Sequence, residues 1–466
     1  MKLLYFLFLQ IVSVSVMGQE YSKTVPVMFI NTVDNAPITS KEEYVDAQYY
    51  VETFESSKYE SVGSAESTLP LQIRYRGNWT LTNFDKKPYK IKLGKKTSLL
   101  GLKRNKHFAL LAHADARRGF LRNTVGFYIS RRLGMDYTPD QVPVEVVLNG
   151  EYIGLYFLTE TIRVDENRLV LTEQKDNETD LSKIENGGWL LEIDNYEDPH
   201  QFLADVEGTS LPELRVTWHY PEELSNEQLN YVKNQVAKLI DLFRNNQKDN
   251  ESLSALVDLD ELAKYYITAE VIDHMEAFIG SCFFHKQEGG TWRFGPVWDC
   301  GVAFYEYHDK NQFIYENNIF GNAGIIEELI KFDSFNEKVK ENYATFKSTI
   351  YNDVFPFIDS FIDEIKVAAV ANYKRWPQYE NENVAERAEY VKECLRIKTD
   401  YLDTAWGGQE TSIHSIISND DYLGLYSLQG QKVGEYPKEN IDLHQLKPGV
   451  YIVGSKGKRS KKVLVK

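Results

Sequence analysis

Cysteine is scarce in this sequence: 466 residues contain three, Cys282, Cys300 and Cys394. Three cysteines can form at most one bridge, which excludes a fold held together by several disulfides. A bridge between Cys282 and Cys300 would be able to form in an oxidising compartment. Three buried free thiols are the alternative, which we favour.

Positive charge is also in short supply. Lys and Arg number 53 against 69 Asp and Glu, which gives a formal net charge of −16. Because nucleic-acid binding depends on Lys and Arg that neutralise phosphates, we expect no nucleic-acid partner. A hydrophobic fraction of 42% is ample for a buried core, and the length predicts two or three domains.

Long apolar runs are missing after the first eighteen residues. Lys2 precedes an apolar run from Leu3 to Val16, and Gly18-Gln19 provides a cleavage point. This layout is typical of a secretory signal peptide, whereas a membrane span needs about 20 apolar residues. We therefore expect a signal peptide at residues 1–18, a secreted or cell-surface protein and no transmembrane span. A buried N-terminal strand is the alternative.

Strand patterns dominate the first half of the chain, and helical patterns the second. Segments such as 71–75 are rich in β-branched and aromatic residues, and Asn149-Gly150 between two apolar runs predicts a hairpin. Ser225 and Gln228 form a capping box for a helix, and Asp258 begins another. Short strands are expected at 282–286 and 292–298, and helices at 117–133, 325–346 and 385–402. We therefore predict an α+β fold, β-rich to about residue 215 and helical over 216–405.

The last fifty residues are short strands divided by Gly and Pro turns. Lys447-Pro-Gly-Val-Tyr and the closing Lys462-Val-Leu-Val-Lys466 resemble the C-terminal sorting domain of type IX secretion substrates. After a linker at 406–415, we expect a small β-sandwich at 416–466. The resemblance implies the type IX secretion machinery as a partner. A permanent β-sandwich without a sorting role is the alternative.

Two basic segments stand out in this acidic chain. Lys90 and Lys92 alternate with apolar residues, so both ammonium groups share one face of a strand. A lysine on such a strand holds nucleotide phosphates in kinase-like folds, and a solvated strand face is the alternative. A second basic cluster runs from Lys103 to Arg122. It could bind a phosphate or another anion, or its cations could pair with Asp115 or Glu145, and the sequence favours neither alternative.

Carboxylates follow two apolar strands. Asp299 comes after Gly295-Pro-Val-Trp and precedes Cys-Gly, so its side chain would project into a cleft. Mg²⁺ needs one or two carboxylates in addition to substrate phosphates; a turn residue is the alternative. Glu160 closes the strand from Leu155, where it would pair with a lysine, contact a nucleotide or cap the next turn.

Five segments in order resemble the CotH family of atypical kinases, over roughly Val25 to Asp400. They are Arg76-Gly-Asn-Trp-Thr, Lys87-Pro-Tyr-Lys-Ile-Lys-Leu, Asn149-Gly-Glu-Tyr-Ile-Gly-Leu-Tyr, Gly188-Trp-Leu-Leu-Glu-Ile-Asp and Gly295-Pro-Val-Trp-Asp. The resemblance implies a two-lobed, atypical protein-kinase-like domain at 19–405. It also implies transfer of the ATP γ-phosphate, with Mg²⁺ or Mn²⁺, to a secreted or surface protein or to a glycan.

The resemblance also implies a set of site residues. Phosphate binding falls to the lysine-rich strand, with Lys90 first and Lys87 second, and the remaining nucleotide-binding candidates are Lys92, Arg76 and Glu160. Asp299 matches the metal-binding aspartate. Glu276 stands at the catalytic aspartate position, and Ser281 at the position of a metal-binding asparagine. Gly301 stands where the family often has a second aspartate.

These departures leave two classes of function open. One is a secreted kinase, although ATP is scarce outside the cytoplasm. The other is a catalytically weak or inactive CotH scaffold that acts as a surface binding or adhesion protein. A third idea, glycoside hydrolysis by Glu160 and Glu276, rests on the carboxylates alone. The kinase hypothesis predicts that Lys90 or Lys87, Glu276 and Asp299 converge, whereas a Glu276 inside the helical core would contradict it.

Overall fold

The computed structural model describes residues 21–54, 57–114, 120–304, 324–379 and 383–407, together with four short strands between 422 and 465. The predicted signal peptide and most of the predicted linker lie outside these residues. The chain forms two units, Met1–Arg396 and Ile397–Lys466, which we describe separately.

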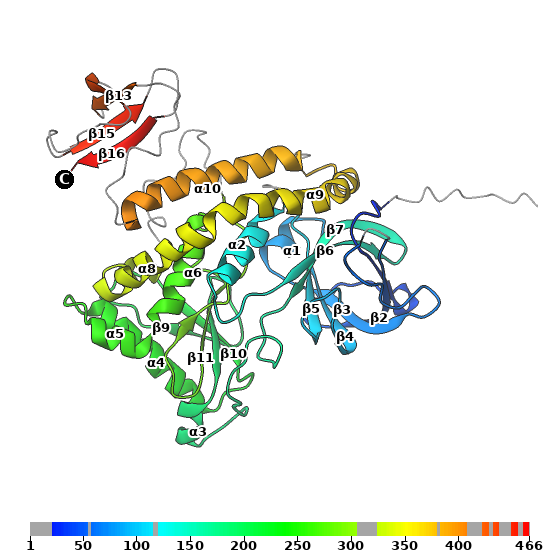
Figure 1. Ribbon diagram of the computed structural model, residues 1–466. Coiled ribbons are helices and arrows are strands. Elements are labelled where there is room, and N and C mark those ends of the chain that lie inside the picture. Colours follow the sequence, from blue (N-terminus) through cyan, green and yellow to red (C-terminus); the bar gives the residue numbers. More distant parts are fainter. Residues whose placement is uncertain are drawn as a thin grey trace, which may run out of the picture. The chain divides into compact units, whose positions relative to one another are not determined.

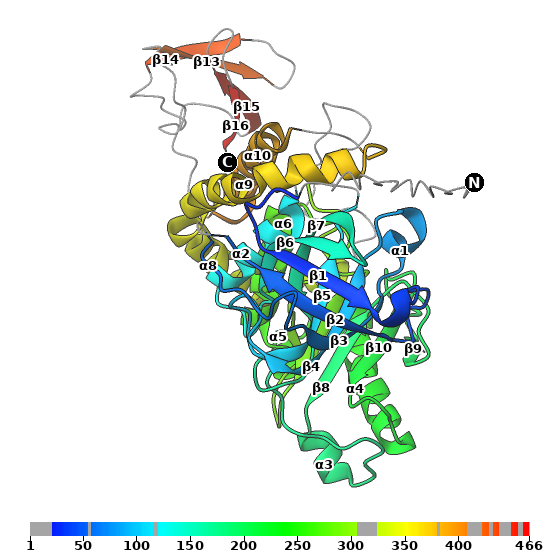
Figure 2. The same cartoon turned by 90° about the vertical axis from the view of Figure 1, so that its right-hand side faces the viewer.

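The first seven strands of unit one close into a barrel, in the order β1-β2-β3-β4-β5-β7-β6 (Figures 1 and 2). Neighbours are antiparallel except at the closure, where β1 runs parallel to β6. Alternate side chains such as Ile91 and Val144 fill the interior. The strands are β1 (Val27–Thr32), β2 (Val45–Glu52), β3 (Leu69–Tyr75), β4 (Tyr89–Thr97), β5 (Asn105–Leu111), β6 (Gln141–Leu148) and β7 (Glu151–Glu160).

Two local predictions are confirmed in the barrel. Asn149 (φ +50°) and Gly150 (φ +79°) form the two-residue turn between β6 and β7. Positive φ at both positions is the type I′ geometry that Asn-Gly favours. Lys90 and Lys92 share one face of β4, and because Ile91 and Leu93 fill the interior, both lysines point out of the barrel.

A second sheet has the order β12-β11-β8-β10-β9. Residue 215 is the predicted boundary between the β-rich and the helical regions of the sequence. The sheet crosses this boundary, because β8 precedes it, β11 follows it, and the two strands pair. The strands are β8 (Trp189–Ile193), β9 (Gln201–Ala204), β10 (Leu214–Tyr220), β11 (Cys282–Lys286) and β12 (Arg293–Phe294). Successive side chains on a strand point to opposite faces of the sheet, so Ile193 and Glu192 of β8 lie on different faces.

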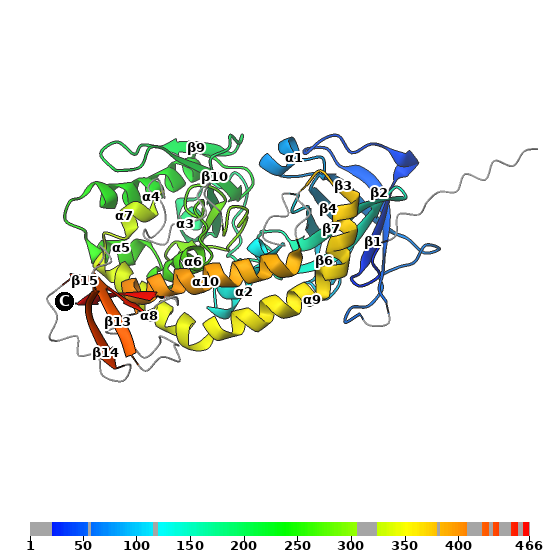
Figure 3. The same ribbon diagram turned by 90° about the horizontal axis from the view of Figure 1, so that it is seen from above.

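Helices pack around this sheet and along the barrel (Figure 3). The capping box at Ser225 and Gln228 is present, and Asp258 caps α6 as predicted. A short 3-10 helix, η1 (Val33–Asn35), follows β1. The α-helices are α1 (Trp79–Asn83), α2 (Leu121–Arg132), α3 (Leu181–Asn186), α4 (Asn226–Arg244), α5 (Asn250–Leu256), α6 (Leu259–Val271), α7 (Ile326–Leu329), α8 (Asp333–Thr349), α9 (Tyr351–Arg375) and α10 (Val384–Trp406).

The long helix α9 is fastened to the barrel at β7. The Leu155 N–H donates to Asn372 Oδ1 at 3.1 Å, and Trp376 Nε1 donates to the Ile153 carbonyl at 2.9 Å. Gly154 lies at the joint with φ +105°, and a Cβ there would lie 2.5 Å from Asn372 Oδ1. A glycine is therefore required for α9 to approach this strand so closely.

The predicted α+β class is confirmed, with a sheet-rich first half and helices later. In unit two, β13 (Tyr422–Ser427), β14 (Lys432–Pro437), β15 (Gly449–Gly454) and β16 (Ser460–Val465) form one antiparallel sheet in the order β14-β13-β15-β16. The second layer of a β-sandwich stays a prediction. Cys282, Cys300 and Cys394 are buried free thiols. In the part of the chain that the structure describes, every helix is too short or too polar to cross a membrane.

Candidate functional site

Asp299 lies five residues after β12, in the loop that leads away from the second sheet. Its side chain is exposed, whereas Trp298 and Cys300 on either side are buried. Its φ of +49° is uncommon for a residue other than glycine, although Asp tolerates it better than most. Buried neighbours on both sides therefore hold an exposed carboxylate on a fixed piece of backbone.

Two further carboxylates lie on β8 and its extension. Glu192 is 8% exposed and Asp194, two residues on, is half-buried on the same face. The Asn195 N–H donates to Asp194 Oδ1 at 2.8 Å. Burial, together with the charges of Glu192 and Asp299, nevertheless raises the pKa of Asp194 to about 6. The charges of Glu192 and Asp299 both act on Asp194. The pairing of β8 with β11 brings these carboxylates together.

Glu276 completes the acidic group. It is exposed, lies six residues before Cys282 at the start of β11, and does not enter the helical core. Desolvation and then the charge of Asp299 raise its pKa. Tyr196 borders the same group: it is 43% exposed, and after desolvation the charges of Glu276, Asp194 and Asp299 raise the pKa of its hydroxyl.

Arg76 brings a positive charge to these carboxylates from the barrel side. It follows β3, and its guanidinium carbon lies 5.6 Å from the centroid of the Trp298 ring. Burial lowers the pKa of Arg76, while Asp299 and Glu192 oppose that shift. The guanidinium stays charged, because the ordinary pKa of arginine is so high. Arg76 is therefore the side chain through which barrel and second sheet meet electrostatically.

Lys90 lies next to Arg76 on the outer face of the barrel. Burial, followed by the charges of Arg74, Arg163 and Arg76, lowers the pKa of Lys90 to about 8, and Glu222 opposes the shift. Within the described ranges, its ammonium group has no hydrogen bond or ion pair. A half-buried ammonium among three guanidinium groups favours an anion as its neighbour.

Lys92 extends this positive face by two residues. It lies opposite His107 on β5. Burial, and then the charges of Arg163, Lys90, Lys92 and Lys106, lower the pKa of His107 to about 3, so the imidazole is neutral at physiological pH. The outer face of β4 is thus strongly positive in a chain of net charge −16.

Lys87 and Glu160 are held elsewhere. The Lys87 ammonium donates to the Leu81 carbonyl at 2.7 Å. Glu160 pairs with Arg168 at 2.9 Å, with both side chains fully buried, and it accepts from the Tyr137 hydroxyl at 3.0 Å. Glu160 is therefore a structural carboxylate at the end of β7. Its burial also removes it as a partner of Glu276 in sugar hydrolysis.

No three His, Cys, Asp or Glu side chains of the described residues are close enough together to hold a metal ion by themselves. The donors present fit an ion that arrives with phosphates, because Mg²⁺ is usually held by one or two carboxylates plus substrate oxygens. Asp299 and Asp194 are the candidates. Ser281 directly precedes β11 and stands opposite Asp194 in the register of that strand with β8. A Cβ at Gly301 would lie 3.2 Å from Asp299 Oδ1, so an aspartate there would add a second carboxylate at the same point.

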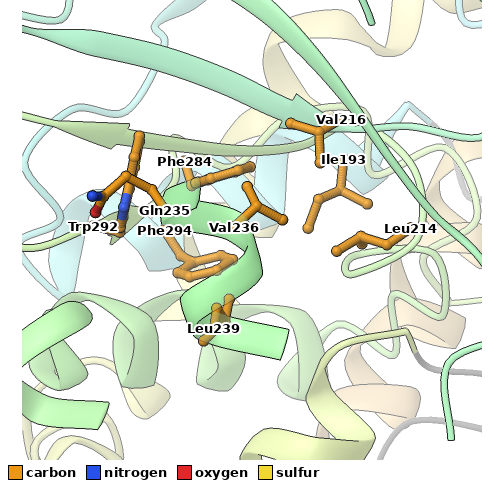
Figure 4. Close-up of a pocket in the computed structure, with 9 residues that line it drawn as sticks. All are labelled: Ile193, Leu214, Val216, Gln235, Val236, Leu239, Phe284, Trp292 and Phe294. Atoms are coloured by element: carbon orange, nitrogen blue, oxygen red, sulfur yellow. The ribbon is translucent and has the colours of Figure 1, made fainter. Parts of the chain in front are cut away.

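An apolar pocket occupies the opposite face of the second sheet, against α4 (Figure 4). Its lining consists of Ile193, Leu214, Val216, Gln235, Val236, Leu239, Phe284, Trp292 and Phe294. Ile193 points into it, whereas its neighbours Glu192 and Asp194 point to the other face. The pocket therefore belongs to the core under the sheet and has no part in the charged site.

In this site, cations from the end of β3 and from β4 lie on the barrel side, and carboxylates lie on the second sheet and its loop. A family model described as CotH kinase protein matches residues 73–402, more than two thirds of the chain. The chain therefore belongs to the CotH family. No curated protein matches it.

The sequence predicted no role for Glu192, Asp194 or Arg163, although Glu192 and Asp194 lie in the Gly188-Trp-Leu-Leu-Glu-Ile-Asp segment that supports the family resemblance. Glu192 and Asp194 are charged residues at alternate positions of an otherwise apolar strand, the same signal that identified Lys90 and Lys92. Two carboxylates on one face of a buried strand indicate a site for the same reason as two lysines. Arg163 gave no such signal, because it lies in the connection after β7.

Proposed function

We propose that this chain is an exported phosphotransferase that moves the γ-phosphoryl group of ATP to a hydroxyl of an extracytoplasmic protein or glycan. The observation that carries the proposal is the position of Arg76: it follows β3 diagonally across from Lys90 on β4, its guanidinium lies over the Trp298 ring next to Asp299 in sequence, and the charges of Asp299 and Glu192 act on it. Phosphates need such cations, and a nucleotide-bound metal needs such carboxylates. The barrel and the second sheet would then correspond to the two lobes of a kinase-like domain.

Each group has a task in this proposal. Lys90 and Arg76 bind phosphate oxygens through charge-assisted hydrogen bonds, and Lys92 extends the positive field. Asp299 and Asp194 would hold Mg²⁺ or Mn²⁺, which neutralises charge on the transferred phosphoryl group when it is bound. Glu276 accepts the proton of the acceptor hydroxyl. The bond from acceptor oxygen to γ-phosphorus forms as the bond to the ADP oxygen breaks.

The test is binding of ATP with Mn²⁺ or Mg²⁺ to the purified full chain, measured by calorimetry, followed by detection of phosphate transfer to the protein itself. Asp299→Ala should bind the nucleotide and metal far more weakly than the wild type. Asp363→Ala, which removes an exposed carboxylate from α9, is the matched control and should bind normally. An Asp299→Ala protein that binds as well as the wild type would refute the metal assignment.

A binding or adhesion role without catalysis is the second candidate. It is favoured by the lack of a three-ligand metal group among the described residues, and by Trp79 on α1, which is 64% exposed. Such a protein would bind its partner equally well with and without ATP and would transfer no phosphate. Loss of partner binding in Trp79→Ala, with Asp299→Ala unaffected, would favour this candidate.

We also propose that the chain is exported through its first eighteen residues and sorted by residues 416–466 to the cell surface. Support comes from the signal-peptide layout and from the Lys-Pro-Gly-Val-Tyr and Lys-Val-Leu-Val-Lys segments. Cells that express the chain without residues 416–466 should retain it in the periplasm. Normal appearance of that truncated chain at the surface would contradict the sorting role.

A further inference from the structure

Asn123, near the start of α2, is hydrogen-bonded to the backbone beside Asp299. The Cys300 N–H donates to Asn123 Oδ1 at 2.8 Å, and the bond is buried. Asn123 is 6% exposed and Cys300 is fully buried, so water does not replace this bond. The two residues are far apart in the sequence, and α2 lies between barrel strands β5 and β6. The bond therefore joins an element of the barrel half to the loop that carries Asp299.

The contact between α2 and this loop has no spare room. A Cβ on Gly126 would lie 2.8 Å from Cys300 Sγ and 3.1 Å from Ile272 Cδ1. Glycine at this position lets α2 lie directly on the turn formed by Asp299 and Cys300. Asp299 has φ +49°, a conformation that persists where the surroundings impose it. The Asn123 bond and the close Gly126 contact are such surroundings.

The far end of α2 is fixed as well. The Tyr128 and Phe357 rings stack with their centroids 4.0 Å apart, and Arg132 pairs with Asp353 at 2.9 Å. Helix α2 is thus held on α9 at one end and supplies Asn123 at the other. A helix anchored in this way can set the position of a loop, because it cannot follow the loop if the loop moves.

The chemical nature of Asn123 also matters. The loop needs a buried acceptor for the Cys300 N–H, since an orphan N–H there would be costly. A carboxylate would accept the bond but would add another negative charge next to the turn that carries Asp299. The amide oxygen of asparagine accepts the bond without that charge. The residue type therefore suits a position next to an acidic group.

We infer that Asn123 is the positioning residue for Asp299: its amide fixes the Asp299–Cys300 turn, and thereby the carboxylate that would receive the nucleotide-bound metal. The inference rests on the proposed function for its role in metal binding, whereas the fixing of the turn stands independently. A purely structural role is the competing explanation. In that case, loss of Asn123 would lower stability without moving the metal-binding carboxylate.

The test compares Asn123→Ala with Thr124→Val. Thr124 is the next residue of α2, is also buried, and its hydroxyl bonds to the Phe120 carbonyl at 3.0 Å and to Gln141 Nε2 at 2.7 Å. Thr124→Val therefore costs buried hydrogen bonds on the same helix without touching Cys300. Should Asn123→Ala fail to fold, Asn123→Gln displaces the amide by one methylene and serves the same purpose.

Two readouts are needed. Hydrogen exchange of a peptide covering residues 297–303 reports the Cys300 amide, and calorimetry reports Mn²⁺ affinity in the presence of ATP. Asn123→Ala should speed exchange and weaken Mn²⁺ binding by about tenfold, the loss expected for one hydrogen bond. Thr124→Val should lower the melting temperature but leave both readouts unchanged.

The outcomes separate this inference from the proposed function. Unchanged exchange in Asn123→Ala would overturn the inference outright. Faster exchange with unchanged Mn²⁺ affinity, in a protein whose wild type binds ATP and Mn²⁺, would also overturn it, because Asn123 would then be structural only. If the wild type binds no ATP and Mn²⁺, the proposed function fails, and the exchange result alone decides whether Asn123 fixes the turn.

Discussion

Carboxylates lie at the ends of strands in two regions of this molecule, and the two regions treat them differently. Glu160, at the end of β7, is fully buried and has a cation, a hydroxyl and two backbone N–H groups as partners. Asp194 and Asp299, in the second sheet and its loop, are partly or largely exposed and lie among further carboxylates. Strand-end position alone therefore does not separate a structural carboxylate from a functional one.

The difference lies in the charge balance around each group. Arg168 neutralises the charge of Glu160, so Glu160 needs no bound cation to balance its charge. Arg76 acts electrostatically on Glu192 and Asp299, and the His219 imidazole lies 2.6 Å from Glu192, whereas the charge of Asp299 raises the pKa of both Asp194 and Glu276. Carboxylates that raise one another's pKa repel, and a divalent cation would relieve that repulsion. The second region is therefore the one in which a bound cation would change the charge balance.

The largest expected effect is that of Asp299→Asn, which keeps the shape but removes the charge. We expect phosphate transfer and nucleotide–metal affinity to fall by about 100-fold or more, because a metal ligand is lost. Thermal stability should stay level or rise slightly, since repulsion among the carboxylates is reduced. Calorimetry and thermal unfolding of the same sample measure both quantities. A marked loss of stability would indicate that Asp299, like Glu160, is a structural carboxylate.

Glu160→Gln should have the opposite profile. The substitution leaves the buried Arg168 without its counter-charge, which costs about 3 to 5 kcal/mol of unfolding free energy in comparable cases. Urea unfolding measures the loss, and the ATP affinity of the folded fraction should be unchanged. The control is Glu166→Gln: Glu166 is exposed, pairs with Lys96 at 3.4 Å, and should cost under about 0.5 kcal/mol. Equal costs for the two variants would contradict the comparison.

The affinity for ATP should fall as pH rises above about 8. The pKa of Lys90 is lowered to about 8 by burial and neighbouring cations, and bound phosphate favours the charged ammonium. Binding is therefore at full strength below pH 8 and weakens as Lys90 loses its proton, by up to about tenfold per pH unit. Calorimetry between pH 7 and 9 measures the trend. Lys90→Met should bind weakly but show a flat profile; an equally steep profile in that variant would assign the titration elsewhere.

Glu276→Asp should have the smallest effect. It shortens the side chain by one methylene and restores the residue that the resemblance places at this position. A general base must lie within hydrogen-bond reach of its proton, so we expect the transfer rate to change by less than about tenfold while ATP affinity stays constant. Glu276→Gln should abolish the rate instead. Equal rates for the Asp and Gln variants would remove Glu276 from catalysis.

Local patterns in the sequence predicted local structure well. The Asn149-Gly150 turn, the capping box at Ser225 and the alternation of Lys90 with Ile91 each depend on residues next to one another. Their physical causes, backbone conformation and side-chain period, are set within a few positions. The motifs around Arg76 and Asp299 also identified two members of the charged site. These parts of the molecule could therefore be read without the structure.

The remaining site depends on contacts between distant segments. Glu192 and Asp194 join Asp299 because β8 pairs with β11, and no local pattern specifies that pairing. The reverse holds for Glu160: its role is decided by Arg168, which packs back from the following loop and fully buries it. Lys87, the first residue of a motif, donates to the carbonyl of Leu81 in α1. The roles of Glu160 and Lys87 therefore depend on the groups that they contact and not on their residue types.

The parallel pairing of β1 with β6 has a consequence for how the chain is made. β1 leaves the ribosome more than a hundred residues before the strand that completes its hydrogen bonding. At usual rates of synthesis that delay is roughly ten seconds, during which β1 offers an unpaired edge to other chains. The barrel cannot close while only its first strands exist. The barrel is complete only when β7 has followed as well, because β7 joins β5 to β6.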